Sequence, residues 1–106
     1  YRAPYPDAAS RKPVLVWPRQ VPIDNEPADV VERVNAYNQW LMSSELPKLH
    51  VYASPGALNP PEMIAFLSQQ MTNYESAYIG QGIHFIQEDE PEAIGRAVSD
   101  WYRRTQ

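Results

Sequence analysis

The sequence contains no cysteine, only four glycines and no long apolar run. The lack of cysteine excludes disulfides, thiolate metal sites and cysteine nucleophiles. No apolar segment approaches the roughly 20 residues that a membrane-spanning helix needs, so we expect no contact with a membrane. A formal net charge of -4 gives no electrostatic basis for a nucleic-acid partner. With 106 residues, the chain is long enough for one domain and too short for two ordinary ones.

Prolines divide the chain, because six of the eleven lie within residues 1–27, at positions 4, 6, 13, 18, 22 and 27. Proline removes a backbone donor and restrains the preceding residue, so we predict an ordered loop over this stretch. The stretch also carries Val14, Leu15, Val16 and Trp17, which are too apolar for a solvated linker. We therefore expect residues 1–27 to pack against a partner surface.

From residue 27 the pattern predicts helix, strand, helix, strand and helix. Apolar residues recur at helical spacing from Val30 to Leu41, and two short apolar runs at Leu49–Ala53 and Tyr74–Ile79 are typical of strands. Between the strands we expect a helix capped by Asn59, with Glu62 reaching back to its first turn. The last helix is predicted over residues 91–104.

The strand-helix-strand order implies two parallel strands joined by a right-handed crossover. Parallel sheets are normally covered by helices on both faces and contain more than two strands. Two strands alone leave at least one edge that needs a neighbour. We therefore expect α/β architecture, as the closing third of a larger doubly wound sheet, and no independent stable fold.

A histidine follows the second predicted strand, in the segment Gly80-Gln81-Gly82-Ile83-His84. A histidine on a glycine-containing turn between a strand and a helix is well placed to reach out of a scaffold. In the α/β-hydrolase triad the histidine comes last in chain order, which suits His84. The nucleophile elbow of that plan is missing, because no two glycines have the required spacing. The chain is thus expected to supply one part of an active site.

Five segments together resemble the haloalkane dehalogenases, in the order in which that family has them and over nearly the whole chain. They are Trp17-Pro18-Arg19-Gln20-Val21-Pro22-Ile23, Glu26-Pro27-Ala28-Asp29-Val30-Val31, Pro47-Lys48-Leu49, Pro55-Gly56-Ala57-Leu58 and Gly82-Ile83-His84-Phe85-Ile86-Gln87-Glu88-Asp89. Tyr1-Arg2-Ala3-Pro4-Tyr5 is also similar to a segment of that family's helical cap. The resemblance implies the C-terminal part of an α/β-hydrolase sheet, two parallel strands with flanking helices, over residues 24–106. Residues 1–23 would form the end of the cap.

The resemblance implies hydrolysis of a haloalkane to an alcohol and a halide ion. In the family an aspartate displaces halide and forms an alkyl ester, and a histidine then deprotonates the water that hydrolyses the ester. His84 matches this histidine, and its ordinary pKa of about 6.5 permits a neutral imidazole near neutral pH. The aspartate, the halide-binding tryptophan and asparagine, and an acidic glutamate are expected on upstream polypeptide. Ala53 and Ser54 occupy the place that some members use for the triad acid, and neither can serve.

The resemblance also implies an apolar substrate pocket, which suits a haloalkane because this substrate offers little for polar groups to bind. No metal and no cofactor is expected, and the compartment implied is the cytoplasm. Glu88, Asp89 and Glu90 are more simply explained as caps of the following helix. His50 is predicted to be structural, because no second histidine stands at ligand spacing. The residues that match pocket positions are Pro18, Val21, Ala57, Leu58 and Phe85.

Two other interpretations stay open. Luciferase-type monooxygenases share the fold and a similar C-terminal pattern, although Asn59-Pro60-Pro61 after Leu58 fits the dehalogenases better. The chain could also be a non-catalytic fragment or interaction module whose exposed sheet edge binds another chain.

Overall fold

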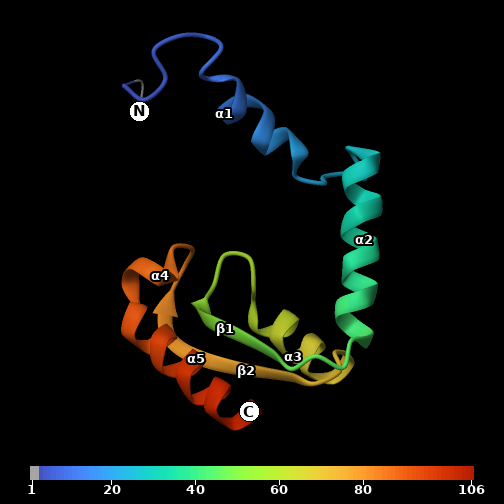
Figure 1. The fold of residues 1–106 in the computed structure, drawn as a ribbon, viewed down its shortest axis with the longest axis vertical. Coiled ribbons are helices and arrows are strands. Elements are labelled where there is room, and N and C mark those ends of the chain that lie inside the picture. Colours follow the sequence, from blue (N-terminus) through green and yellow to red (C-terminus); the bar gives the residue numbers. More distant parts are fainter. Residues whose placement is uncertain (1–2) are drawn as a thin grey trace. The chain divides into compact units, whose positions relative to one another are not determined.

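A computed structural model describes residues 3–106 of the chain (Figure 1). Tyr1 and Arg2, with which the cap-like segment at the start begins, lie outside the described residues. Contacts group the chain into two compact units, Tyr1–Trp40 and Leu41–Gln106. The elements in chain order are α1 (Lys12–Val16), the 3-10 helix η1 (Trp17–Gln20), α2 (Ala28–Ser43), β1 (Lys48–Pro55), α3 (Pro61–Gln70), β2 (Tyr74–Gly82), α4 (Ile86–Asp89) and α5 (Pro91–Thr105).

The first unit is more helical than the sequence predicted, since α1 and η1 lie within the stretch expected to be a loop. The reason is the placement of the prolines. Pro13 and Pro18 each occupy one of the first two positions of a helix, where the missing backbone N–H has no partner to lose. Ahead of α1, the carboxylate of Asp7 accepts a hydrogen bond from the backbone N–H of Ser10 at 2.8 Å. The prediction of a loop throughout residues 1–27 was therefore wrong.

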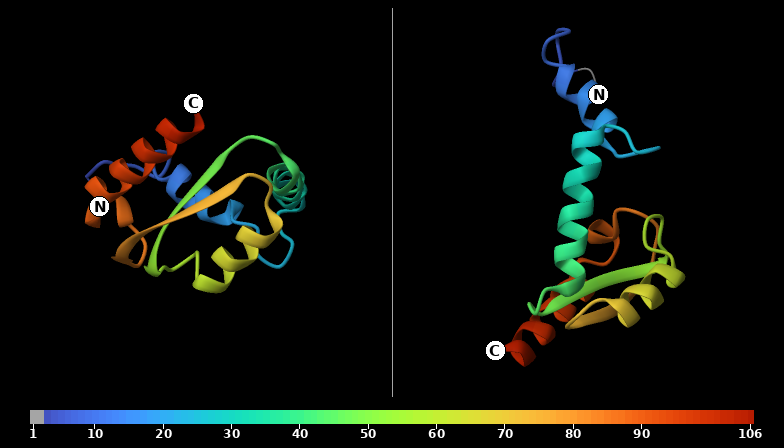
Figure 2. Two further views of the ribbon diagram at one scale, coloured as in Figure 1. Left: turned by 90° about the horizontal axis from the view of Figure 1, so that it is seen from below. Right: turned by 90° about the vertical axis from the view of Figure 1, so that its right-hand side faces the viewer.

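The second unit contains the predicted strand-helix-strand arrangement. β1 and β2 pair in parallel, with Lys48 opposite Tyr74 and Tyr52 opposite Tyr78, and the pairing continues to Pro55 opposite Gly82 after an irregularity. Figure 2 shows α3 and α5 on opposite sides of the two strands. At one end of α5 the guanidinium of Arg104 donates to the carboxylate of Glu75 on β2 at 2.8 Å. Both strands run further than predicted, and the extra residues of β2 lead the chain to the turn that carries His84.

The predicted cap of the helix between the strands was wrong. α3 begins at Pro61, and the residue in the capping position is Pro60, in extended conformation and without a side-chain cap hydrogen bond. Neither Asn59 nor Glu62 closes the helix as expected. Two consecutive prolines already supply the extended residue and the fixed first-turn geometry, so this helix start needs no side-chain cap.

The core within this chain is small. Among residues 3–106, only Ala53 and Ile64 are buried hydrophobic residues, and no large side chain is fully buried. Large hydrophobic side chains are exposed on both units, from 37% for Tyr5 to 80% for Trp17. Tyr37 and Trp40, which belong to the apolar periodicity between Val30 and Leu41, are 51% and 56% exposed. A self-contained domain of this length would bury far more apolar surface.

Candidate active site at the carboxyl ends of the two strands

His84 lies on a short turn between the end of β2 at Gly82 and the start of α4 at Ile86. The turn lies against the end of β1. A Cβ at residue 82 would come within 2.8 Å of Cγ2 of Ile86 and 3.1 Å of the Cβ of Ala53, so the backbone approaches closely here. Only glycine lets the strand end this near its neighbour before the chain turns outward.

The loop after β1 is hydrogen-bonded to the histidine turn. The backbone N–H of Gly56 donates to the carbonyl of Gly82 at 3.1 Å, and the N–H of Ala57 donates to the carbonyl of Ile83 at 2.6 Å. The first bond joins the loop after β1 to the last residue of β2, and the second joins that loop to the turn after β2. They bring Ala57 and Leu58 to the same end of the sheet as His84.

Ala57, Leu58 and His84 line one hollow of about 140 Å³. Phe85 lies beside His84, with ring centroids 4.6 Å apart and the rings edge to face. His84 and Phe85 also line a second, wider groove together with Glu88 and Asp89. The structure therefore gathers four of the six predicted site residues at one end of the sheet. These residues place the exposed imidazole of His84 next to apolar side chains.

Ile83 is a lining residue that the sequence reasoning missed. It borders both hollows, and its side chain is 66% exposed, comparable with Leu58 at 71% and Phe85 at 60%. Its position directly before the histidine, within the same motif, was the available signal. Leu58 and Ile83 line the same hollow as His84, and Phe85 is in ring contact with it, which suits a ligand with little polarity.

The acidic residues near His84 do not take the roles that were expected. Glu88 and Asp89 belong to the short helix α4, and Glu90 occupies the capping position of α5 without a side-chain cap hydrogen bond. The prediction that they cap α5 through their side chains was therefore wrong. No carboxylate in residues 3–106 makes a hydrogen bond or ion pair with His84. Ala53 and Ser54, at the place where some dehalogenases carry the triad acid, are themselves part of β1 near its carboxyl end.

His50, predicted to be structural, lies in the middle of β1 with Tyr74 beside it. Its Nδ1 and the Tyr74 hydroxyl are 2.8 Å apart, and the two rings meet edge to face. Partial burial lowers the pKa of His50 below its ordinary value of 6.5. Burial, with Tyr52 as a smaller cause, raises the pKa of Tyr74. Within the described part of the chain, no group of three or more His, Cys, Asp or Glu residues could hold a metal ion.

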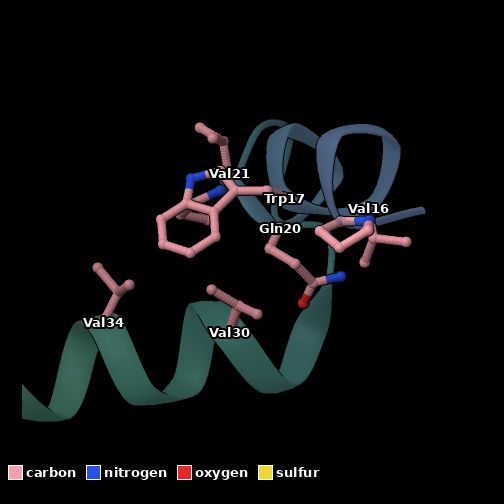
Figure 3. A pocket seen from close by; sticks show the side chains of 8 residues that line it. Val16, Trp17, Gln20, Val21, Val30 and Val34 are labelled. Carbon is pink, nitrogen blue, oxygen red and sulfur yellow. The ribbon is translucent and has the colours of Figure 1, made fainter. Parts of the chain in front are cut away.

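Pro18 and Val21 belong to the first unit. Val21 lines an apolar hollow of about 560 Å³ inside that unit, where the indole of Trp17 lies over Val30 and Val34 of α2 (Figure 3). Pro18, in η1, is not among the residues that line this hollow. Trp17 is nevertheless 80% exposed. The predicted contact of Pro18 and Val21 with the substrate stays a prediction. The residues lining the hollow are Pro13, Val16, Trp17, Gln20, Val21, Pro22, Val30 and Val34.

None of the helices formed by residues 3–106 has the length and apolar character needed to cross a membrane. No family model matches the sequence. The sequence is, however, similar to individual proteins along nearly its whole length.

The fold is that of part of an α/β-hydrolase. A haloalkane dehalogenase of Bradyrhizobium diazoefficiens is 43% identical over 101 residues, which are 95% of this chain and 33% of that protein. A haloalkane dehalogenase of Sphingobium indicum is 44% identical over 105 residues, 98% of this chain and 35% of the relative. The crystal structure of the haloalkane dehalogenase DatA from Agrobacterium tumefaciens C58 matches with a TM-score of 0.82 and 37% identity, covering 100% of this chain and 36% of that one.

The chain is thus a homologue of the C-terminal portion of haloalkane dehalogenases, and it spans about a third of the length of the curated relatives it matches. The predicted fold class is confirmed. The luciferase-type alternative is not favoured.

Proposed function

We propose that this chain is the C-terminal segment of a haloalkane dehalogenase and contributes the histidine that activates water. The observation that carries the proposal is the common hollow of Ala57, Leu58 and His84, in a chain homologous to dehalogenases. An imidazole that water can reach, beside apolar side chains that suit an alkyl group, supports hydrolysis of an alkyl ester. Phe85, in ring contact with His84, would complete the apolar wall.

The proposed reaction has two steps. In the first, an aspartate carboxylate attacks the carbon that carries the halogen, a carbon-oxygen bond forms, and halide leaves with the bonding electron pair. In the second, His84 takes a proton from water while the water oxygen attacks the ester carbonyl carbon. Collapse of the resulting tetrahedral intermediate releases the alcohol, which takes back the proton, and restores the aspartate. Neither step needs a metal or an organic cofactor.

The remaining groups would come from upstream polypeptide. They are the aspartate, the tryptophan and asparagine that hold the halide, and a glutamate that orients His84. Within this chain we assign residues 1–23 to the end of the cap, which would bring Pro18 and Val21 to the pocket, and residues 24–106 to the main domain. Haloalkane and water are the proposed substrates and halide a product. A cytoplasmic location stays a prediction.

Halide release from a dibromoalkane tests the proposal. The complete polypeptide that carries residues 1–106 is expected to release halide continuously above a buffer control. The 106-residue chain alone is expected to release none, because it has no elbow nucleophile and no halide-binding pair. Release of halide by the chain alone would contradict the proposal that the nucleophile and the halide-binding residues lie upstream. If the complete polypeptide releases no halide, the proposed function is contradicted.

A further inference from the structure

We infer that Gly56 and Ala57 are positioning residues for His84, so that the loop that contacts the substrate and the turn that carries the histidine move as one unit. The inference rests on the proposed function and adds to it a coupling between substrate binding and the water-activating step. Its basis is the backbone between the two strand ends, where hydrogen bonds continue beyond the sheet.

The ladder of β1 and β2 ends with Pro55 opposite Gly82. After Pro55, the N–H of Gly56 donates to the carbonyl of Gly82 at 3.1 Å, and the N–H of Ala57 donates to the carbonyl of Ile83 at 2.6 Å. The second acceptor belongs to the residue directly before His84. A displacement of the Ala57 backbone is therefore passed to the histidine through a single peptide unit.

Gly56 holds the loop in the conformation that these bonds require. Its φ is +63°, in the left-handed region that favours glycine. A Cβ there would lie 2.8 Å from the carbonyl oxygen of Ala53 and 3.0 Å from that of Asn59. Both obstacles are backbone atoms, which cannot rotate away as a side chain does. The conformation of Gly56 thus fixes the direction in which the N–H of Ala57 points.

The consequence concerns the second chemical step. Ala57, Leu58 and His84 line the same hollow, so a shift of the loop would change both substrate contact and imidazole position. Formation of the alkyl ester uses an already ionised carboxylate and needs no base, whereas ester hydrolysis needs His84 within reach of the water. A displacement of about 1 Å is enough to slow a positioned step by about 100-fold.

Ala57→Pro in the complete polypeptide tests the inference, because proline removes the N–H that donates to Ile83. We expect one halide per site to appear in a burst of full amplitude, followed by hydrolysis about 100-fold slower than in the unaltered protein. Intact-protein mass spectrometry should show the accumulated alkyl ester. The control is Gly95→Ala on α5, where a Cβ meets nothing within 4 Å, and both steps should keep their rates.

An unchanged rate of ester hydrolysis in Ala57→Pro would overturn the inference. So would a burst that falls together with turnover while the melting temperature is kept, because that result assigns the loop to binding alone. If the unaltered polypeptide releases no halide, the proposed function fails. The hydrogen-bonded link between the loop and the histidine turn must then be tested by a structural measurement, because no reaction rate is available.

Amide hydrogen exchange of the unaltered polypeptide provides that independent measurement, and it also serves if Ala57→Pro does not fold. The amides of Gly56 and Ala57 are expected to exchange as slowly as those of the β1 ladder. In Gly56→Ala, protection should fall at residues 56 and 57. Exchange of the Ala57 amide at the rate of an open chain in the unaltered protein would overturn the inference.

Discussion

A Cβ at Gly82 would lie 3.1 Å from the Cβ of Ala53, so the turn that carries His84 is held directly against the end of the neighbouring strand. Ala53 is one of the two buried hydrophobic residues of the described chain, at 4% exposure. The Cγ2 of Ile86 would lie 2.8 Å from the same Cβ. Packing at this point, rather than a hydrogen bond to the imidazole, fixes where the chain leaves β2 toward the histidine.

Gly82→Ala is therefore expected to destabilise the complete polypeptide by about 1–3 kcal/mol, the usual effect of inserting a methyl group where no space exists. Gly95→Ala is the matched control, because it adds the same methyl group to an open helical position. We expect that control to stabilise by about 0.5–1 kcal/mol. Denaturant unfolding of the three proteins measures both effects. Equal stability of the Gly82 and Gly95 variants would contradict the close packing.

His50, the partly buried histidine of β1, predicts how the stability of the folded protein depends on pH. Burial lowers the pKa of His50 in the folded state, so the unfolded chain binds a proton more readily. Stability should be fully present above the ordinary pKa of 6.5 and should fall as the pH falls through that value. Unfolding of the complete polypeptide at pH 7.5 and 5.5 checks this. The loss should be smaller in His50→Gln, and an equal loss in both proteins would contradict the assignment to His50.

The exposed apolar surface predicts association. Since Ala53 and Ile64 are the only buried residues among positions 3–106, the isolated chain should require the remaining strands of the sheet to fold stably. At micromolar concentration we expect the isolated chain to aggregate, as measured by light scattering, or to unfold without one cooperative transition, as measured by circular dichroism. A monomer that unfolds in one cooperative transition would show instead that residues 1–106 are a self-sufficient domain.

The sequence predicted the βαβ arrangement because apolar periodicity and strand composition agree there, from Leu49 to Ile79. It placed the strand ends wrongly, since glycine and proline signal a turn when read alone. In the structure Gly80 adopts a φ of +120° within β2, where the register is irregular, and the strand continues to Gly82. A local signal cannot reveal that a neighbouring strand remains in hydrogen-bond reach.

The same limit explains the helix missed at Lys12–Val16. A proline interrupts a helix when it lies in the interior, but it favours the start of a helix when it lies in the first turn. Pro13 lies in the first turn of α1, and the sequence alone does not distinguish the two cases. At the site, the motif identified His84, Ala57 and Leu58, and only coordinates could show that they share a hollow. Ile83 was missed because an apolar residue at a strand end is usually core, whereas here it is exposed.

The most direct test of the account is His84→Phe in the complete polypeptide, exposed to a 1-haloalkane and examined by intact-protein mass spectrometry. The account predicts one halide per site in a burst, no further turnover, and a protein mass increased by the alkyl group. The reason is that the aspartate attacks without a base, whereas water at neutral pH requires one. Sustained turnover by the variant would contradict the role of His84 in catalysis, and loss of the burst with the fold preserved would assign His84 to binding instead.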